Sequence, residues 1–326
     1  ISNDGSIGGT LAAGDGVNTI TLTSTSNVGV DVTSGSGNDT ISNDGVIGRD
    51  LLAGAGDNVI TSTNSIGGTI TVGDGDDLIT NSGTVGSDIN AGNGTNTITL
   101  TTNSDVGGDV TAGTGSDTIS NDGMITGSVL AGAGNNVITN DGSVGVDVIT
   151  TSGNDMVSGS GSIGGNVDVG EGTNSVNLLV GSSVGGSVTA GSGADMISNA
   201  GDITLGVSAG DGDNDITNSG TVGGSVTAGI GNDTVDNTGA IGGDLNIGEG
   251  DNTVTLAGAS NIDGSIITGA GDDSITGVSV VGGDVMAGAG NNTISFGTGS
   301  NVTGNITTAA GPGTVSYTHL TLPTIA

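Results

Sequence analysis

Apolar and polar residues alternate along nearly the whole chain, in a pattern that repeats every 19 or 21 residues. In the copy at 113–131, Ile119 shares strand parity with Asp117 and Asn121, and a second apolar set begins at Ile125. Side chains alternate faces along a strand, so these residues are expected to point inward while the Ser and Thr between them point outward. The pattern predicts two short strands per repeat, separated by glycine-rich corners.

The corners carry the motif Gly-x-Gly-x-(Asn/Asp)-x-(Ile/Val). It begins at positions 14, 35, 54, 73, 92, 113, 132, 170, 191, 210, 229, 248, 269 and 288, with degenerate copies at Thr151 and Ala309. Frequent Gly and β-branched residues argue against helix. One repeat cannot bury its apolar face alone, but stacked repeats can. The sequence therefore predicts an all-β fold: a parallel β-helix or β-roll solenoid of about 16 coils of 19 or 21 residues.

The ninth motif position separates short coils from long ones. Most short coils carry Asn there, as in Asn121-Asp122-Gly123, whereas the long coils carry Leu22, Leu100, Leu178 and Leu256, and the last carries Phe296. We expect Asn to bond the backbone of an Asn-x-Gly turn whose glycine has positive φ. We expect Leu to extend the strand by a residue pair and to fill a wider corner.

Composition excludes several classes of protein. With 70 Gly and 1% aromatic residues, the chain cannot build an ordinary globular core. Arg49 is the only Lys or Arg against 34 Asp and Glu, a formal net charge of -33, which excludes nucleic acid and anionic membranes as partners. The chain has no Cys, hence no disulfides and no thiolate metal sites. Arg49 replaces a Gly of most repeats, and we expect a lone surface cation beside Asp50.

The repeat units resemble those of two families of secreted bacterial proteins. AGTGSDTIS, VGDGDDLIT and AGIGNDTVD resemble the nonapeptide of RTX proteins, which binds Ca²⁺ between the turns of a parallel β-roll. The full unit is similar to the repeats of large RTX adhesins, one of which binds ice through its solenoid, and the resemblance covers Gly14 to about Thr314. Repeats such as Asn81-Ser-Gly-Thr-Val85 also resemble autotransporter passengers. These resemblances imply a secreted or cell-surface protein.

The fifth motif position departs from the RTX pattern because Asp alternates there with Asn. One hypothesis is a Ca²⁺ held between coils by one carboxylate, one Asn amide oxygen and glycine carbonyls, a ligand set that hard cations accept. The alternative is a metal-free polar ladder, since alternation halves a repulsion of about 3.5 kcal/mol between carboxylates ~4.8 Å apart. The candidate calcium ligands are Asp39, Asp77, Asp117, Asp155, Asp195, Asp233 and Asp273.

The C-terminus differs from the repeats. Val315 to Thr324 reads VSYTHLTLPT, which resembles the translation of an adapter used in sequencing libraries, and it holds the only His, His319. We therefore expect residues 1–314 to form one repetitive solenoid of a longer protein and residues 315–326 to be an artefact tail. Without that tail the repeats contain no His, Cys, Lys or Tyr, so no usual general base or nucleophile is present and we expect no enzyme.

These observations predict a stalk or passenger segment of a secreted or surface-anchored bacterial adhesin-like protein, stabilised by calcium. Its expected partners are divalent cations, and host or cell-surface ligands bound by other parts of the full protein. One alternative is a metal-free autotransporter passenger. Another is an ice-binding solenoid, although the second motif position carries only one Thr, Thr114, among acidic and apolar residues.

Overall fold

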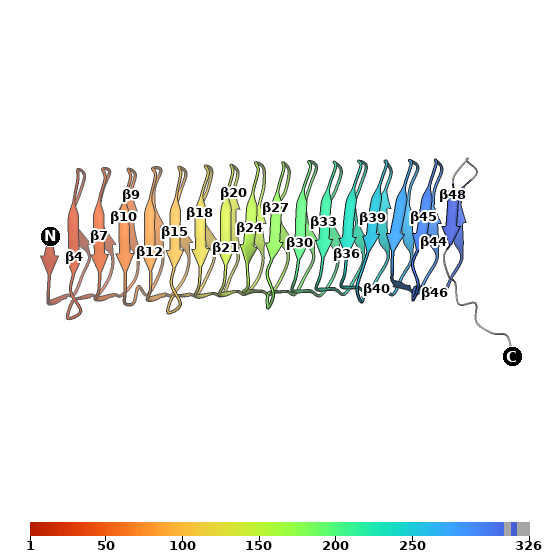
Figure 1. Ribbon diagram of the computed structural model, residues 1–326. Coiled ribbons are helices and arrows are strands. Elements are labelled where there is room, and N and C mark those ends of the chain that lie inside the picture. Colours follow the sequence, from red (N-terminus) through yellow and green to blue (C-terminus); the bar gives the residue numbers. More distant parts are fainter. Residues whose placement is uncertain (310–313, 318–326) are drawn as a thin grey trace. The chain divides into compact units, whose positions relative to one another are not determined.

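The computed structural model describes residues 1–309 and 314–317, and these residues form parallel β-strands without any helix (Figure 1). The strands stack as a β-solenoid of about 16 turns, which confirms the predicted fold class. The chain divides into two compact units, Ile1–Val169 and Gly170–Ala326, and each is described by itself. No helix within the described residues is long and apolar enough to cross a membrane.

In the first unit the strands form three parallel sheets, here named A, B and C, and sheet B is interrupted at Ile66, which pairs with Ile47 and Val85 through single bridges. Sheet A contains β1 (Ser2–Asn3), β4 (Thr19–Leu22), β7 (Thr40–Asn43), β10 (Val59–Ser62), β12 (Leu78–Asn81), β15 (Thr97–Leu100), β18 (Thr118–Asn121), β21 (Val137–Asn140) and β24 (Met156–Gly159). Sheet B contains β2 (Ser6–Ile7), β5 (Asn27–Val28), β8 (Val46–Ile47), β13 (Thr84–Val85), β16 (Asp105–Val106), β19 (Met124–Ile125), β22 (Ser143–Val144) and β25 (Ser162–Ile163). Sheet C contains β3 (Leu11–Ala12), β6 (Val32–Thr33), β9 (Leu51–Gly54), β11 (Ile70–Val72), β14 (Ile89–Asn90), β17 (Val110–Thr111), β20 (Val129–Gly132), β23 (Val148–Thr150) and β26 (Val167–Asp168).

The second unit repeats the same arrangement. Its sheet A strands are β27 (Ser175–Leu178), β30 (Met196–Asn199), β33 (Asp215–Asn218), β36 (Thr234–Asn237), β39 (Thr253–Leu256), β42 (Ser274–Gly277), β45 (Thr293–Phe296) and β48 (Thr314–Tyr317). Those of sheet B are β28 (Ser183–Val184), β31 (Asp202–Ile203), β34 (Thr221–Val222), β37 (Ala240–Ile241), β40 (Asn261–Ile262), β43 (Val280–Val281) and β46 (Asn301–Val302). Those of sheet C are β29 (Val188–Thr189), β32 (Val207–Ser208), β35 (Val226–Thr227), β38 (Leu245–Gly248), β41 (Ile266–Thr268), β44 (Val285–Ala287) and β47 (Ile306–Thr308).

The C-terminal segment that the sequence set apart is described only in part. Val315 to Tyr317 belong to β48, whose backbone pairs in parallel with β45. His319 lies outside the described residues.

Coils have three strands, except that the coil of Ile66 has a single bridge in place of its sheet B strand, so the prediction of two was wrong. The expected second strand is interrupted by a bend at Thr126–Ser128, between β19 and β20. The bend is held from the preceding coil, because the Ser128 N–H donates to Asp109 Oδ1 at 2.7 Å. Three short strands enclose one narrow core, and the predicted inward residues on both sides of the bend are buried, among them Ile125 and Val129.

Identical positions stack directly on one another between coils. Ile41, Ile60, Ile79 and Ile98 are paired in register through β7, β10, β12 and β15, and each is at most 1% exposed. Burying such a side chain contributes about 1.5–3 kcal/mol relative to leaving it exposed. The parity that the sequence predicted is therefore the parity of the core.

The long coils differ from the prediction in where they place their two extra residues. β4 is as long as β7, and Leu22 pairs in register with Asn43. The extra residues instead form a turn at 24–25, closed by the Ser26 N–H donating to the Thr23 carbonyl at 2.9 Å. The Leu side chain is buried, as expected, but the strand is not extended.

The Asn-x-Gly turns are also only partly as predicted. Asn121 Oδ1 accepts the Gly123 N–H at 3.2 Å, and its Nδ2 donates to Asn140 Oδ1 of the next coil at 2.7 Å. The φ of Gly123, however, is not positive. Glycine is needed there because a Cβ would lie 2.5 Å from the Ser104 carbonyl oxygen of the preceding coil.

Candidate functional site

The Gly-x-Gly corners connect sheet C of one coil to sheet A of the next, and in most coils their backbone depends on whether Asn or Asp follows. At the Asn58 corner both glycines have positive φ, 81° at Gly54 and 125° at Gly56. At the Asp77 corner only the second glycine, Gly75, has positive φ, at 151°. Positive φ is costly for residues with a Cβ, so each coil has at least one position reserved for glycine.

This difference in φ explains why Thr151 can replace the first glycine of one motif copy. Thr151 occupies the first glycine position of the Asp155 corner, and at most Asp corners that position does not have positive φ. A side chain is tolerated there without backbone strain.

The alternating Asp and Asn residues at the fifth motif position stack one above another inside the coils, and we call them the Asx column. All of its Asp members from Asp39 to Asp273 are at most 2% exposed. Each backbone N–H donates to Oδ1 of the next member: Asn18 to Asp39 at 2.7 Å, Asp39 to Asn58 at 3.1 Å, and Asn58 to Asp77 at 2.8 Å. The second unit repeats this from Asn174 to Asn292.

The seven predicted metal ligands lie inside the coils, as their strand parity predicted. All seven carboxyl groups face the interior, and within each unit an Asn lies between successive Asp residues of the column. No group of three or more His, Cys, Asp or Glu side chains that could hold a metal occurs among the described residues.

The two kinds of member differ in their second side-chain atom. The Asn58 Nδ2 donates to two carbonyls of its own corner, Gly54 at 3.1 Å and Gly56 at 2.7 Å. The corresponding atom of Asp is Oδ2, which can only accept when the carboxyl is ionised. It is buried and has no hydrogen-bond partner in Asp39, Asp77, Asp117, Asp195 and Asp233.

Burial raises the pKa of several of these carboxyl groups. Desolvation is the largest cause at Asp77 and raises its pKa from 3.8 to about 6, against the opposing hydrogen bonds from Asn58. The nearby carboxylates of Asp57 and Asp76 raise it further. Desolvation likewise raises the pKa of Asp117, Asp195, Asp233 and Asp273.

Exposed acids beside the Asx column are a feature that sequence reasoning missed. Asp57 and Asp76 occupy the fourth motif position, on the surface next to Asp77. Asp213 and Asp251 lie similarly close to Asp233 and Asp273. The sequence contained the signal, because an acid directly precedes the column residue in about a third of the repeats. Such corners carry more negative charge than the column alone.

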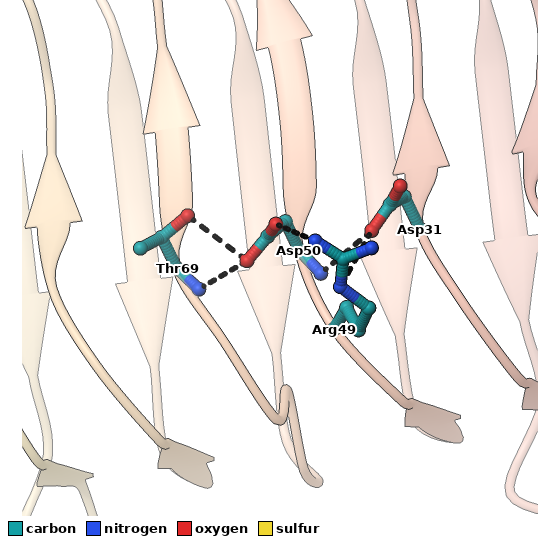
Figure 2. A network of polar contacts seen from close by, with 4 residues as sticks. All are labelled: Asp31, Arg49, Asp50 and Thr69. Atoms are coloured by element: carbon teal, nitrogen blue, oxygen red, sulfur yellow. Dashed lines mark hydrogen bonds and ion pairs between the residues drawn. The ribbon is translucent and has the colours of Figure 1, made fainter.

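A second polar ladder follows the bend before sheet C, where Arg49 lies (Figure 2). The Thr69 N–H donates to Asp50 Oδ1 at 2.9 Å, and the Asp50 N–H donates to Asp31 Oδ1 at 3.3 Å. Arg49 bridges the two carboxylates, with Nε 4.0 Å from Asp31 and Nη2 3.9 Å from Asp50, and its side chain is 66% exposed. As expected, it is an exposed ion pair, worth at most about 1 kcal/mol.

The Thr residues that an ice-binding surface would need are not at the corner. Thr114 is the only Thr at the second motif position, whereas the outer face of sheet A presents Thr or Ser twice in about half of its strands, as with Thr97 and Thr99 of β15. The sequence predicted that these side chains point outward, and in the structure they stack into columns.

Compared with protein-family models, with curated proteins and with solved structures, the chain gives no match.

Proposed function

We propose that this chain is a stalk or passenger segment of a secreted or surface-anchored bacterial adhesin-like protein, and that calcium bound at its Asp corners stabilises it. The observation that carries the proposal is the buried Asp Oδ2 without a partner, repeated along the Asx column. An ionised carboxylate in that position is costly unless a cation or a proton compensates it.

The neighbouring Asn corners indicate what kind of group would compensate the buried charge of Asp Oδ2. At the Asn corners, Nδ2 fills the space between the side chain and two glycine carbonyls as a donor. At the Asp corners a hard cation between Oδ2 and carbonyl oxygens would have the ligand chemistry that Ca²⁺ prefers. Exposed Asp57 and Asp76 beside Asp77 supply further negative charge for a divalent ion.

Charge over the whole chain supports the same proposal. A formal net charge of -33 disfavours the folded state by self-repulsion, and bound divalent cations relieve it. A ligand that binds only the folded state stabilises it by mass action. Low cytoplasmic calcium would then keep the chain unfolded for export, and external calcium would promote coil stacking.

The test of calcium binding is circular dichroism of the chain ending at Thr314. The protein is stripped with chelator and titrated with CaCl₂, with MgCl₂ as the control for general screening. We expect the β signal or its melting temperature to increase with calcium more than with magnesium. A full β signal in excess chelator, with a melting temperature that calcium does not change, would favour the metal-free polar ladder instead.

The role as a stalk rests on how the chain repeats. Four successive motif spacings add up to 78 residues, and this block recurs from position 14 to 92, 170 and 248. Block duplication adds coils without adding a new kind of site. The test is the neighbouring gene sequence: a secretion signal of the RTX type or an autotransporter translocation domain would support the proposal, and a cytoplasmic enzyme domain would contradict it.

A further inference from the structure

The outer face of sheet A in the first unit consists of Thr, Ser and a few apolar residues. From β4 to β24 the first and third residues of each four-residue strand point outward, and none of them is buried. All of them are Thr or Ser except Val59, Leu78, Val137 and Met156. We call this surface the hydroxyl face.

The hydroxyl face carries no charge. Within residues 1–169, all of which the structure describes, neither of its two columns contains an acidic or basic side chain. Exposed acids lie beyond both ends of its strands, such as Asp57 and Asp76 before them and Asp122 after them. Sheet A of the second unit differs, because Asp215 and Asp236 occupy the equivalent outward positions. In a chain of net charge -33, a neutral face is where two copies can approach with least repulsion.

The four apolar side chains on this face form two matching pairs. Val59 and Leu78 lie on neighbouring strands, 37% and 41% exposed, and their Cα positions are paired in register. Val137 and Met156 repeat this arrangement one block later, 39% and 46% exposed. All four stand in the same column, at the first residue of β10, β12, β21 and β24.

We propose that the hydroxyl face binds a second copy of this chain through a two-fold axis parallel to the strands, between β15 and β18. Such an axis reverses the order of the coils and keeps each column opposite itself. Val59 then faces Met156 of the second copy, and Leu78 faces its Val137, so each apolar pair meets the other. A surface that is complementary to itself in this way is what an isologous dimer requires.

The size of the face determines how strong the contact is. About this axis the strands β10 to β24 of one copy face those of the other, and these six strands, spaced ~4.8 Å apart and four residues long, give a flat area of about 400 Å² per copy. Two copies together bury about 800 Å², which is below the ~1,200 Å² of standard stable interfaces. The dimer is therefore weak and concentration-dependent, and it strengthens with salt, because the long-range repulsion is screened within ~3 Å at about 1 M ionic strength.

The test is sedimentation equilibrium of the full chain over a range of concentrations, at low and high NaCl, in calcium and in chelator. We expect the average mass to rise toward twice the chain mass of 30.4 kDa, and more so at high salt. Leu78→Asp places a charge in the contact and should weaken association at least about tenfold, as should Val137→Asp. Met124→Asp is the matched control: it is 47% exposed but lies on sheet B, so association should not change.

The double variant Leu78→Lys with Val137→Asp tests the register itself. In the proposed dimer each Lys faces an Asp of the other copy, so association should return to near the wild-type level. Circular dichroism confirms that each variant is folded. A chain that stays monomeric at all concentrations and salts, a Met124→Asp variant that weakens association equally, or a double variant that fails to restore it would each overturn the proposal. Thermal hysteresis from a monomeric protein, lost in Leu78→Asp, would assign the face to ice instead.

Discussion

Replacing Asp77 by Asn should stabilise the calcium-free protein, and by an amount that the structure allows us to work out. The Asp77 Oδ2 is buried without a partner, and the pKa of this carboxyl is raised from 3.8 to about 6, mainly by desolvation. That difference corresponds to about 3 kcal/mol at ~1.4 kcal/mol per pH unit. An amide has no charge to desolvate, and its Nδ2 can donate to corner carbonyls as that of Asn58 does.

The pH dependence of the gain follows from the direction of the shift. Because the pKa is higher in the folded state, the fold prefers the protonated form of Asp77. Below pH ~4 the carboxyl is protonated in the folded and the unfolded state alike, so it carries no penalty. The penalty grows as the pH rises from about 4 to about 6, and above that it is complete. Asp77→Asn should therefore gain about 3 kcal/mol at neutral pH and almost nothing near pH 3.5.

The assay is urea unfolding in excess chelator at the two pH values, followed by circular dichroism. Asp76→Asn is the matched control, because it removes an equal charge one residue away on the surface, where the side chain keeps its acceptor for the Thr95 N–H. We expect the control to change the free energy of unfolding by less than ~0.5 kcal/mol. An equal gain at both pH values, or no gain at neutral pH, would refute the idea that a buried ionised carboxylate destabilises this corner.

Three further substitutions test other parts of the coil. Asn58→Asp puts three carboxylates in succession in the Asx column and removes the donor to Gly54 and Gly56. The free energy of unfolding in chelator should therefore fall by several kcal/mol, and calcium should restore part of it if the corners bind the ion. Gly56→Ala forces a side chain onto a φ of 125° with a Cβ 2.5 Å from the carbonyl of the preceding coil, and should cost at least about 1–3 kcal/mol in urea unfolding, whereas Ala55→Ser should cost almost nothing. Ile98→Ala empties a position that is 0% exposed and should cost about 2–5 kcal/mol, against less than ~0.5 for outward Thr99→Ala; an equal loss in both would mean that the core is not where the coil places it.

The roles of several residues could be read from the chain without coordinates. Ile119 and Asn121 were predicted to point inward, and they are buried, because strand parity is set by the covalent geometry of successive residues. The ninth position shares the inward parity, and its Leu100 and Phe296 are buried in the long coils. A repeat with a constant period places each such position above its equivalent in the preceding coil, so a local pattern is sufficient to predict the stacking.

Where the predictions failed, the missing information was the path of the chain around the coil. The bend at Thr126–Ser128 divides one expected strand into two, and the added residues of the long coils enter a turn instead of β4. The bend depends on a hydrogen bond to Asp109 Oδ1 of the preceding coil, and the turn is closed by the Ser26 N–H donating to the Thr23 carbonyl. Neither could be predicted from parity.

Period, parity and charge are properties of short stretches of chain, and they were sufficient for the fold class, the inward residues and the alternation of Asp with Asn. The distances between coils are not a property of any short stretch of chain. Gly123 is glycine because the Ser104 carbonyl of the preceding coil lies where its Cβ would be, and Asp77 Oδ2 lacks a partner because the surrounding coils exclude water from it. Val59 and Leu78 become one patch only when two strands 19 residues apart lie side by side. These features arise from contacts between separate turns of the chain, and they exist only once the coils have stacked.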